Sequence, residues 1–200
     1  MRSVSDAQVI KTLREKTGAG VMDCKKALQE CGGDIEKAVE YLKIKGIASA
    51  EKKASREARE GIVEAYVHLN GKIGVLVELN CETDFVARNA EFKQLAHDLA
   101  MQVAAAKPLY VSVADVPDEV VAREREVQRA RALEEGKKEQ IVDKVVEGRM
   151  SKFFAEVCLL NQPFIKDESI TVGDLIKQHI GRIGENITVK RFVRFEVGEA

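Results

Sequence analysis

The chain has 200 residues, of which 45% are hydrophobic and 32% are charged. That is enough apolar material for a substantial core, so a disordered chain and a peptide-sized scaffold are excluded. Lysine and arginine (32) nearly balance aspartate and glutamate (33), for a formal net charge of −1. This balance disfavours indiscriminate binding to nucleic acid and leaves room only for local basic patches. With no tryptophan and three prolines, we expect a mostly helical protein.

The sequence carries no signal for a membrane or for an oxidising compartment. It has no run of about 18 apolar residues, and its first residues lack the apolar stretch of a secretory signal. We therefore expect a cytoplasmic protein with no membrane partner. The cysteines form no C-x-x-C motif and have no histidine at metal-ligand spacing, which favours reduced, mostly buried thiols. They are Cys24, Cys31, Cys81 and Cys158.

Residues 1–46 have the pattern of three short helices that share one core. Ser5 is the expected cap of the first helix and Asp34 of the third, and glycines predict stops after Thr17, after Cys31 and at Gly46. Helices this short are unstable singly, so their apolar faces must pack together. Those faces comprise Val9, Ile10, Leu13, Met22, Ala27, Leu28, Ile35, Ala38, Val39 and Leu42.

Residues 47–60 differ from the segments on either side. They contain strong helix formers and many charges but almost no apolar stripe, a pattern that predicts a solvated helical linker. We therefore predict a domain boundary here, with a helical module over residues 1–46 and a second domain over residues 61–200.

Beyond Gly61 the apolar period changes from 3.6 to 2, which indicates strands. Two alternating runs flank Asn70-Gly71, a strong hairpin signal. A helix over about 90–106, two helical stretches separated at Gly136, a helix after Thr171 and a closing strand over 187–197 follow. Residues 61–200 should thus form an α+β core, in which a small antiparallel sheet packs with helices. The expected apolar faces are Val63, Ala65, Val67 and Leu69; Ile141, Val145, Met150, Phe153 and Val157; and Ile187, Val189, Val193, Phe195 and Val197.

No pattern in the sequence predicts catalysis or a cofactor. The phosphate-binding motif G-x-x-x-x-G-K-[ST] is absent, and Gly18-Ala19-Gly20 follows a helix, where a helix–helix turn is the better interpretation. The three histidines, His68, His97 and His179, are dispersed, and no nucleophile has a base beside it. We expect no catalytic residue, no metal site and no cofactor.

A basic and aromatic strand, Lys190–Phe195, raises the alternative of RNA binding. It lacks the small residue that normally separates the two aromatics, so a half-buried strand explains it better. An adaptor for nucleic acid would combine this strand with the basic residues of the linker, which are Lys52, Lys53, Arg56 and Arg59.

Asp84-Phe85 lies where a strand gives way to a helix, between Asn80 and the expected helix cap Asn89. Phe85 could fold back as a hydrophobic staple on its own helix. Alternatively, the loop could present an exposed acidic and aromatic wedge to a partner. Both interpretations stay open on physical grounds.

Two longer segments resemble the signature segments of the bacterial elongation factor Ts family, in the family's order and separation. They are LREKTGAGVMDCKKAL (Leu13–Leu28) and ELNCETDFVARN (Glu78–Asn89). In addition, IGENITVKR (Ile183–Arg191), which contains Asn186, is similar to the closing strand of that family. The resemblance covers essentially the whole chain.

The resemblance implies a guanine nucleotide exchange factor for elongation factor Tu in translation elongation, which binds the GDP-bound and nucleotide-free partner. It also implies that the first three helices form a ubiquitin-associated-like module. The family segment tied to displacement of the partner's Mg²⁺ maps onto Thr83, Asp84, Phe85 and Val86. Contacts with the partner's nucleotide domain map onto Arg14, Val21, Met22 and Lys25, although Lys25 and Lys26 would equally suit a solvated face.

The length of the chain bears on its assembly. Long members of the family carry a second core half and an inserted coiled-coil hairpin, and 200 residues leave no room for both. The chain therefore resembles the short branch, whose members are expected to form homodimers. Competing interpretations are a nucleic-acid adaptor, a helical recognition module confined to residues 1–46, and an unrecognised hydrolase.

Overall fold

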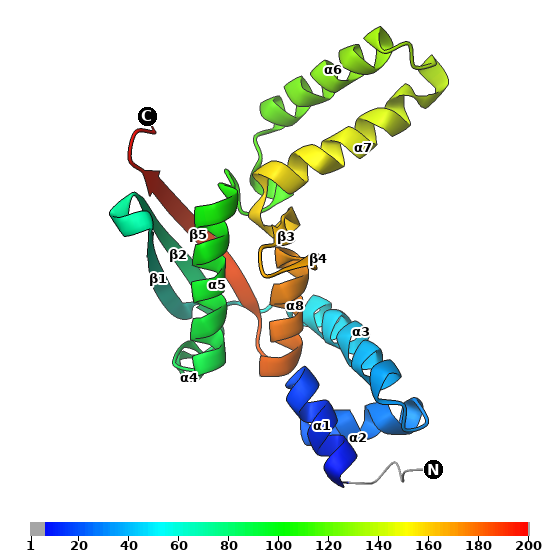
Figure 1. Cartoon of the computed structure of the whole chain (residues 1–200), viewed down its shortest axis with the longest axis vertical. Helices are drawn as coiled ribbons and strands as arrows, with labels where there is room; N and C mark the ends of the chain where they lie inside the picture. Colours follow the sequence, from blue (N-terminus) through cyan, green and yellow to red (C-terminus); the bar gives the residue numbers. More distant parts are fainter. Residues whose placement is uncertain (1–6, 200) are drawn as a thin grey trace. The chain divides into compact units, whose positions relative to one another are not determined.

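The computed structural model describes residues 7–199 as an α+β protein, as predicted (Figure 1). Ser5, the expected cap of the first helix, lies outside the described residues. In chain order the elements are α1 (Ala7–Thr17), α2 (Val21–Glu30), α3 (Ile35–Lys53), β1 (Glu60–His68), η1 (Leu69–Gly71), β2 (Ile73–Cys81), α4 (Asp84–Ala87), α5 (Ala90–Ala106), η2 (Val113–Asp115), α6 (Asp118–Glu134), α7 (Glu139–Val157), η3 (Leu159–Asn161), β3 (Pro163–Phe164), β4 (Asp167–Thr171), α8 (Val172–Ile183) and β5 (Ile187–Glu196).

The chain forms two compact units, each built from segments that are distant in sequence. One unit consists of Met1–Ile62, Leu79–Lys93 and Asp174–Thr188. The other consists of Val63–Glu78, Gln94–Gly173 and Val189–Ala200. The predicted division into residues 1–46, 47–60 and 61–200 remains a prediction.

In the first unit, α1, α2 and α3 share one small core, as the short helices require. Asp34 caps α3, because its Oδ1 accepts hydrogen bonds from the backbone N–H groups of Glu36 (3.0 Å) and Lys37 (3.1 Å). These bonds lower the pKa of the Asp34 carboxyl, since they favour its charged form. The fully or nearly buried residues of the core are Val9, Leu13, Cys24, Ala27, Leu28 and Ala38.

The expected helix stop at Gly46 is wrong, because α3 continues to Lys53. Gly46 lies against Gly181 of α8, where a Cβ on Gly181 would be only 2.7 Å from the Gly46 Cα. The glycine thus serves a close helix crossing. Only residues 47–53 of the predicted linker are helical, and residues 54–59 connect α3 to β1.

The three strands of the larger sheet are ordered β1-β2-β5, and α5 lies along one face of the sheet (Figure 1). The predicted hairpin is confirmed: β1 and β2 are joined through Leu69, Asn70 and Gly71, all with positive φ. On β2 the alternation is regular, and its inward residues are all buried. They are Ile73, Val75, Val77, Leu79 and Cys81. A second, two-stranded sheet pairs β3 with β4 in antiparallel fashion and was not predicted.

On β1 the predicted apolar face points away from α5 and is exposed, although an apolar face was expected to pack inward. Val63 and Val67 are 65% and 67% exposed. The polar face instead contacts α5: the Glu64 carboxylate lies 2.9 Å from the His97 Nδ1, and the Tyr66 ring meets the edge of the same imidazole. A hydrogen-bonded pair therefore occupies the position where an apolar side chain was expected.

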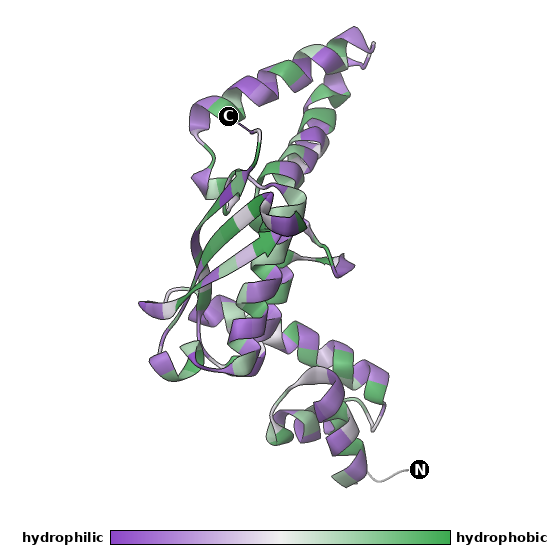
Figure 2. Cartoon of the chain, turned by 60° about the vertical axis from the view of Figure 1, so that its left-hand side comes forward, coloured by the Kyte–Doolittle hydropathy of each residue, from purple (hydrophilic) through white to green (hydrophobic). Residues whose placement is uncertain are grey.

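The single apolar face predicted for β5 is also wrong in its second half. Ile187 and Val189 are buried, but Val193, Phe195 and Val197 are exposed. The alternation changes phase at two consecutive exposed residues, Lys190 and Arg191. In Figure 2 hydrophobic and hydrophilic positions alternate along the strands of this sheet. Its face away from α5 thus carries the apolar side chains Val63, Val67, Leu76, Val193 and Phe195.

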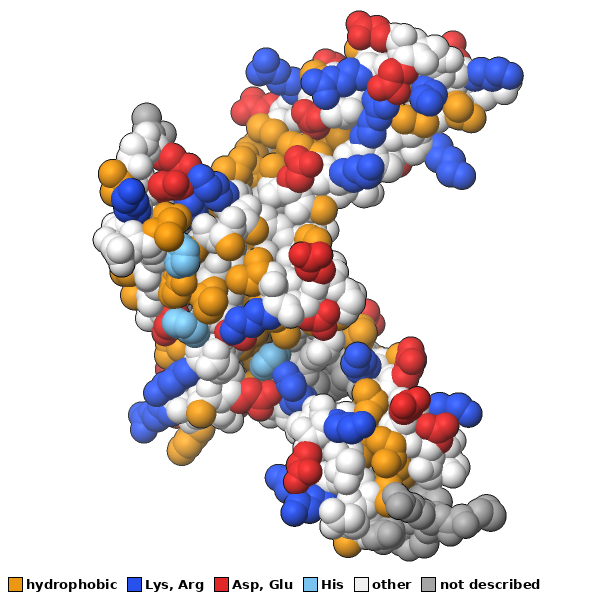
Figure 3. All heavy atoms as spheres, in the orientation of Figure 1, with side chains coloured by type: hydrophobic (Ala, Val, Ile, Leu, Met, Phe, Trp, Pro, Cys, Tyr) orange, Lys and Arg blue, Asp and Glu red, His pale blue; other side chains and the backbone are white. Residues whose placement is uncertain are grey.

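Helices α6 and α7 form an antiparallel hairpin that turns at Gly136, whose φ is +75°. Its small core contains Ala132, Val142, Val146 and Met150. The predicted face is confirmed in part, because Met150 is buried and Val145 and Phe153 pack against this core, whereas Ile141 is exposed. The outer surface is densely charged (Figure 3). Ion pairs cross between the two helices, and they join Arg125 to Glu147, Arg129 to Asp143, and Arg149 to Glu135.

Candidate partner-binding site

The Thr83–Val86 segment forms the first turns after β2, and it is folded into the short helix α4 (Asp84–Ala87). Thr83 caps this helix, because its Oγ1 accepts the backbone N–H of Val86 at 3.4 Å. Phe85 is 81% exposed, so the interpretation as a staple folded onto its own helix is wrong. The loop instead holds a large aromatic side chain in solvent, which is a substantial loss of burial for a soluble protein.

Asp84 has a cation beside it that the sequence analysis did not single out. The Arg88 NH2 donates a hydrogen bond to the Asp84 Oδ2 at 2.8 Å. The four-residue spacing of Asp84 and Arg88 could have predicted this pair, because side chains four apart on a helix are neighbours. Both side chains are exposed, at 76% for Arg88 and 46% for Asp84, so the pair next to Phe85 contributes little to stability.

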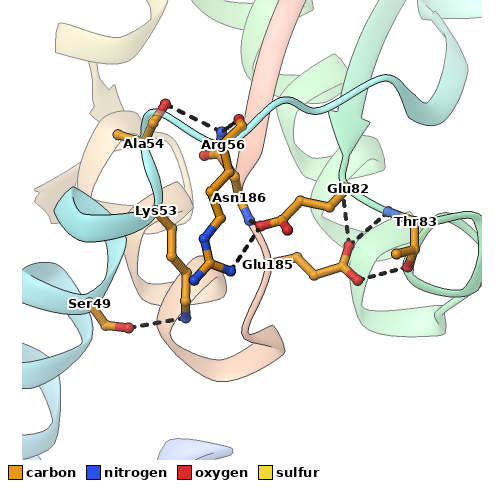
Figure 4. Close-up of polar contacts among 8 residues, drawn as sticks. All are labelled: Ser49, Lys53, Ala54, Arg56, Glu82, Thr83, Glu185 and Asn186. Carbon is orange, nitrogen blue, oxygen red and sulfur yellow. Dashed lines mark hydrogen bonds and ion pairs between the residues drawn. The ribbon is translucent and has the colours of Figure 1, made fainter.

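Glu185, in the turn between α8 and β5, anchors the start of the segment (Figure 4). Its Oε2 accepts hydrogen bonds from the backbone N–H groups of Glu82 (3.1 Å) and Thr83 (3.0 Å). Its Oε1 accepts the Thr83 hydroxyl at 2.7 Å. Sequence reasoning missed this residue, since nothing in the local sequence indicates a partner about 100 positions away.

Further hydrogen bonds connect two loops, the one that follows β2 and the one between α8 and β5, to each other and to residues 54–56. The Glu82 Oε1 accepts the backbone N–H of Asn186 at 2.6 Å, and Arg56 lies 3.5 Å from the same oxygen. The buried Asn186 side chain in turn donates to the Arg56 carbonyl at 2.7 Å. The two loops therefore hold each other through side-chain-to-backbone bonds in both directions (Figure 4).

The second set of predicted contact residues lies on α1 and α2. Arg14, Val21, Met22 and Lys25 are all exposed. The opposite face of α2 supplies Cys24, Ala27 and Leu28 to the core of the three helices, which fixes the outward face. Val21 and Met22 are 50% and 74% exposed, so the structure leaves an apolar surface at the start of α2.

The remaining candidate groups are engaged in structural contacts. The His179 Nδ1 lies 2.9 Å from the Leu175 carbonyl, and His97 is paired with Glu64. Burial raises the pKa of the thiols of Cys24, Cys81 and Cys158, and all four cysteines are free. Within residues 7–199 no three histidine, cysteine or carboxylate side chains are grouped so as to hold a metal ion.

The basic residues considered for RNA binding are mostly paired with carboxylates. Arg191 donates to Glu78 at 2.7 Å, and Arg194, with 8% of its side chain exposed, pairs with Glu196 and Glu199. Arg59 lies 2.5 Å from Glu57. These pairs reduce the positive charge available to a phosphate backbone.

The fold and the site together define an α+β protein with an N-terminal group of three helices and an exposed acidic and aromatic segment on a tightly anchored connection. Residues 7–199 match the family model described as elongation factor TS. The chain is 63% identical to elongation factor Ts of Carboxydothermus hydrogenoformans over 96% of its own length and 89% of that protein. It is 60% identical to the Moorella thermoacetica elongation factor Ts over 95% and 94%, and 57% identical to that of Thermoanaerobacter sp. over 96% and 95%. The chain therefore belongs to the elongation factor Ts family.

Among the helices within residues 7–199, none has the length and apolar character needed to cross a membrane.

Proposed function

We propose that this protein is a guanine nucleotide exchange factor for elongation factor Tu and acts in translation elongation in the cytoplasm. The observation that carries the proposal is the exposed Phe85 on an anchored segment, in a chain of this family. In this proposal α1–α3 form a ubiquitin-associated-like module that contacts the partner's nucleotide domain. The Thr83–Val86 segment acts on the Mg²⁺ site of the partner.

An exchange factor carries out no covalent step. It binds the nucleotide-free partner more tightly than the GDP-bound partner, and by linkage it weakens GDP binding by the same factor. Mg²⁺ requires near-ideal octahedral coordination, so a small displacement of its ligands by Asp84 and Phe85 would loosen the diphosphate. GDP then dissociates and GTP can bind.

The magnitudes favour two contact regions rather than one. Burying a phenylalanine contributes about 1.5–3 kcal/mol, whereas shifting a two-state partner almost completely requires about 5.5 kcal/mol of differential affinity. Phe85 alone falls short of that value. The apolar start of α2, with Val21 and Met22 exposed, supports a second contact that supplies binding free energy.

The test is the release of a fluorescent GDP analogue from elongation factor Tu, with and without the protein. We expect Phe85→Ala to slow the catalysed release by about tenfold or more, since it removes the contribution of one buried phenylalanine. Leu109→Ala is the matched control, because Leu109 is an exposed apolar residue (69%) outside the segment. Release by Phe85→Ala at the wild-type rate would contradict the proposed role of the segment.

We further propose that the protein is a homodimer, as the short branch of the family implies. The observation that supports this is the apolar face of the sheet away from α5, which includes Phe195 (68% exposed) and Val67 (67% exposed). A sheet face with this many exposed apolar side chains is a candidate interaction surface. The same face on a second copy would be self-complementary, as a two-fold contact requires.

A further inference from the structure

We propose that Glu185 is a positioning residue, which holds the Thr83–Val86 segment in the conformation that presents Phe85 to the partner. This inference rests on the proposed exchange function and adds a residue to it. Glu185 would not contact the partner's nucleotide or Mg²⁺. It would act only through the groups that it fixes in this chain.

The first argument is the number of donors that one carboxylate satisfies. The two N–H groups of Glu82 and Thr83 follow directly after the buried end of β2, at Cys81. Both point to one oxygen of Glu185, at 3.1 and 3.0 Å. Hydrogen bonds to an ionised acceptor are shorter and stronger than neutral ones. Two consecutive peptide groups are therefore fixed immediately before α4 begins.

The second argument concerns the hydroxyl of Thr83. A carboxylate can only accept, so the Oε1 of Glu185, at 2.7 Å, requires the hydroxyl to donate to it. The lone pairs of the Thr83 Oγ1 are then directed to the Val86 N–H, which it accepts at 3.4 Å. Glu185 thus orients the cap of α4, the helix that carries Phe85.

The third argument is that the anchor is itself held in place. The carboxylate of Glu82 accepts the backbone N–H of Asn186 at 2.6 Å, next to Glu185. Asn186 is 3% exposed and donates to the Arg56 carbonyl at 2.7 Å. Because Asn186, the next residue in the chain, is fixed by these bonds, Glu185 has a defined position from which to support the segment.

The experiment compares Glu185→Ala, Glu185→Gln and Phe85→Ala in the GDP-release assay, with the concentration of the exchange factor varied. We expect Glu185→Ala to lower the maximal release rate about tenfold or more, and to change the half-saturating concentration much less, because the contacts of α2 remain. Glu185→Gln keeps an acceptor for the two N–H groups, so it should recover part of the rate. Glu126→Ala, at an exposed position of α6, is the control and should behave as wild type.

A double variant separates a positioning role from a general loss of stability. If Glu185 acts through Phe85, then Glu185→Ala added to Phe85→Ala should cause little further loss of rate. Fully additive losses, or an equal loss in Glu185→Ala and Glu185→Gln, would overturn the proposal, as would wild-type release by Glu185→Ala. If elongation factor Tu releases GDP as fast with Phe85→Ala as with the wild-type protein, the proposed function fails instead. Circular dichroism melts of each variant identify any loss of folding.

Discussion

Cys81 illustrates how a single side chain responds to its surroundings. It lies at the buried end of β2, where its thiol donates to the Thr83 carbonyl at 3.2 Å. Burial, and secondarily the charge of Glu185, raises the pKa of this thiol to about 11, against an ordinary value of 9.0. The thiolate is the reactive form, so Cys81 should be inert at neutral pH although it adjoins an exposed segment.

We therefore predict that a thiol-specific reagent at pH 8 labels the partly exposed Cys31 and leaves Cys81 unmodified in the folded protein.

The raised pKa of the Cys81 thiol also predicts how the stability of the fold depends on pH. Below about pH 9 the thiol is neutral in both the folded and unfolded states; between about 9 and 11 only the unfolded state ionises, so the free energy of unfolding should fall as pH rises. Urea denaturation of wild type and Cys81→Ala across this range tests the contribution. A wild-type pH dependence equal to that of Cys81→Ala would contradict it.

At the residue scale, local sequence draws attention to Phe85 but not to the residues that support its segment. Phe85 stands out because an aromatic residue in a polar connection has few local ways to be buried. The sequence alone could not decide between staple and exposed wedge, because that depends on how α4 is capped. Glu185 could not be found at all, since its three partners are about 100 positions away.

At the scale of elements, the crossing of α3 and α8 depends on two glycines. A Cβ on Gly181 would lie 2.7 Å from the Gly46 Cα and 3.3 Å from its carbonyl oxygen, whereas a Cβ on Gly46 would have 3.9 Å to the Gly181 Cα. The two positions face each other but tolerate a methyl group differently. The contact is between backbones, which cannot yield as a side chain can.

We predict that Gly181→Ala lowers the free energy of unfolding by about 1–3 kcal/mol, as overpacking commonly does. Amide hydrogen exchange should become faster in residues 47–53, the part of α3 beyond the crossing. Gly46→Ala is the matched control and should be neutral or stabilising by up to about 1 kcal/mol, since alanine favours the helix interior. Equal effects of the two substitutions would show that the close crossing is not what selects glycine at position 181.

Element by element, periodicity located most helices and the strands of the larger sheet, but it missed β3 and β4 and did not always indicate the side that is buried. Val63 and Val67 alternate as a buried strand would, yet they are exposed because Glu64 and Tyr66 pair with His97 on the other face. The stop at Gly46 failed for a related reason. A glycine signals either an end or a close approach, and the choice depends on an element that follows more than 100 residues later.

On the scale of the whole chain, the near-zero net charge is accompanied by local clusters of paired opposite charges. Lys107 lies 2.7 Å from Glu196 and Glu199, and Arg194 pairs with the same two carboxylates. Lys107 and Arg194 lower the pKa of Glu196 to about 2. Each such pair neutralises a cation that could otherwise contact a polyanion. The apolar surface is different: within the described residues, no element covers the face of the sheet that points away from α5.

Phe195→Glu tests whether that face joins two copies. The residue is 68% exposed, so the substitution should cost little in an isolated chain, but in a two-fold contact it would bury two like charges at a cost of several kcal/mol. In sedimentation experiments at micromolar concentration, we expect wild type to be dimeric and Phe195→Glu monomeric. Phe85→Ala, which removes a still more exposed phenylalanine (81%) outside this face, should remain dimeric. A monomeric wild type would contradict the homodimer, and a dimeric Phe195→Glu would show that another surface forms it.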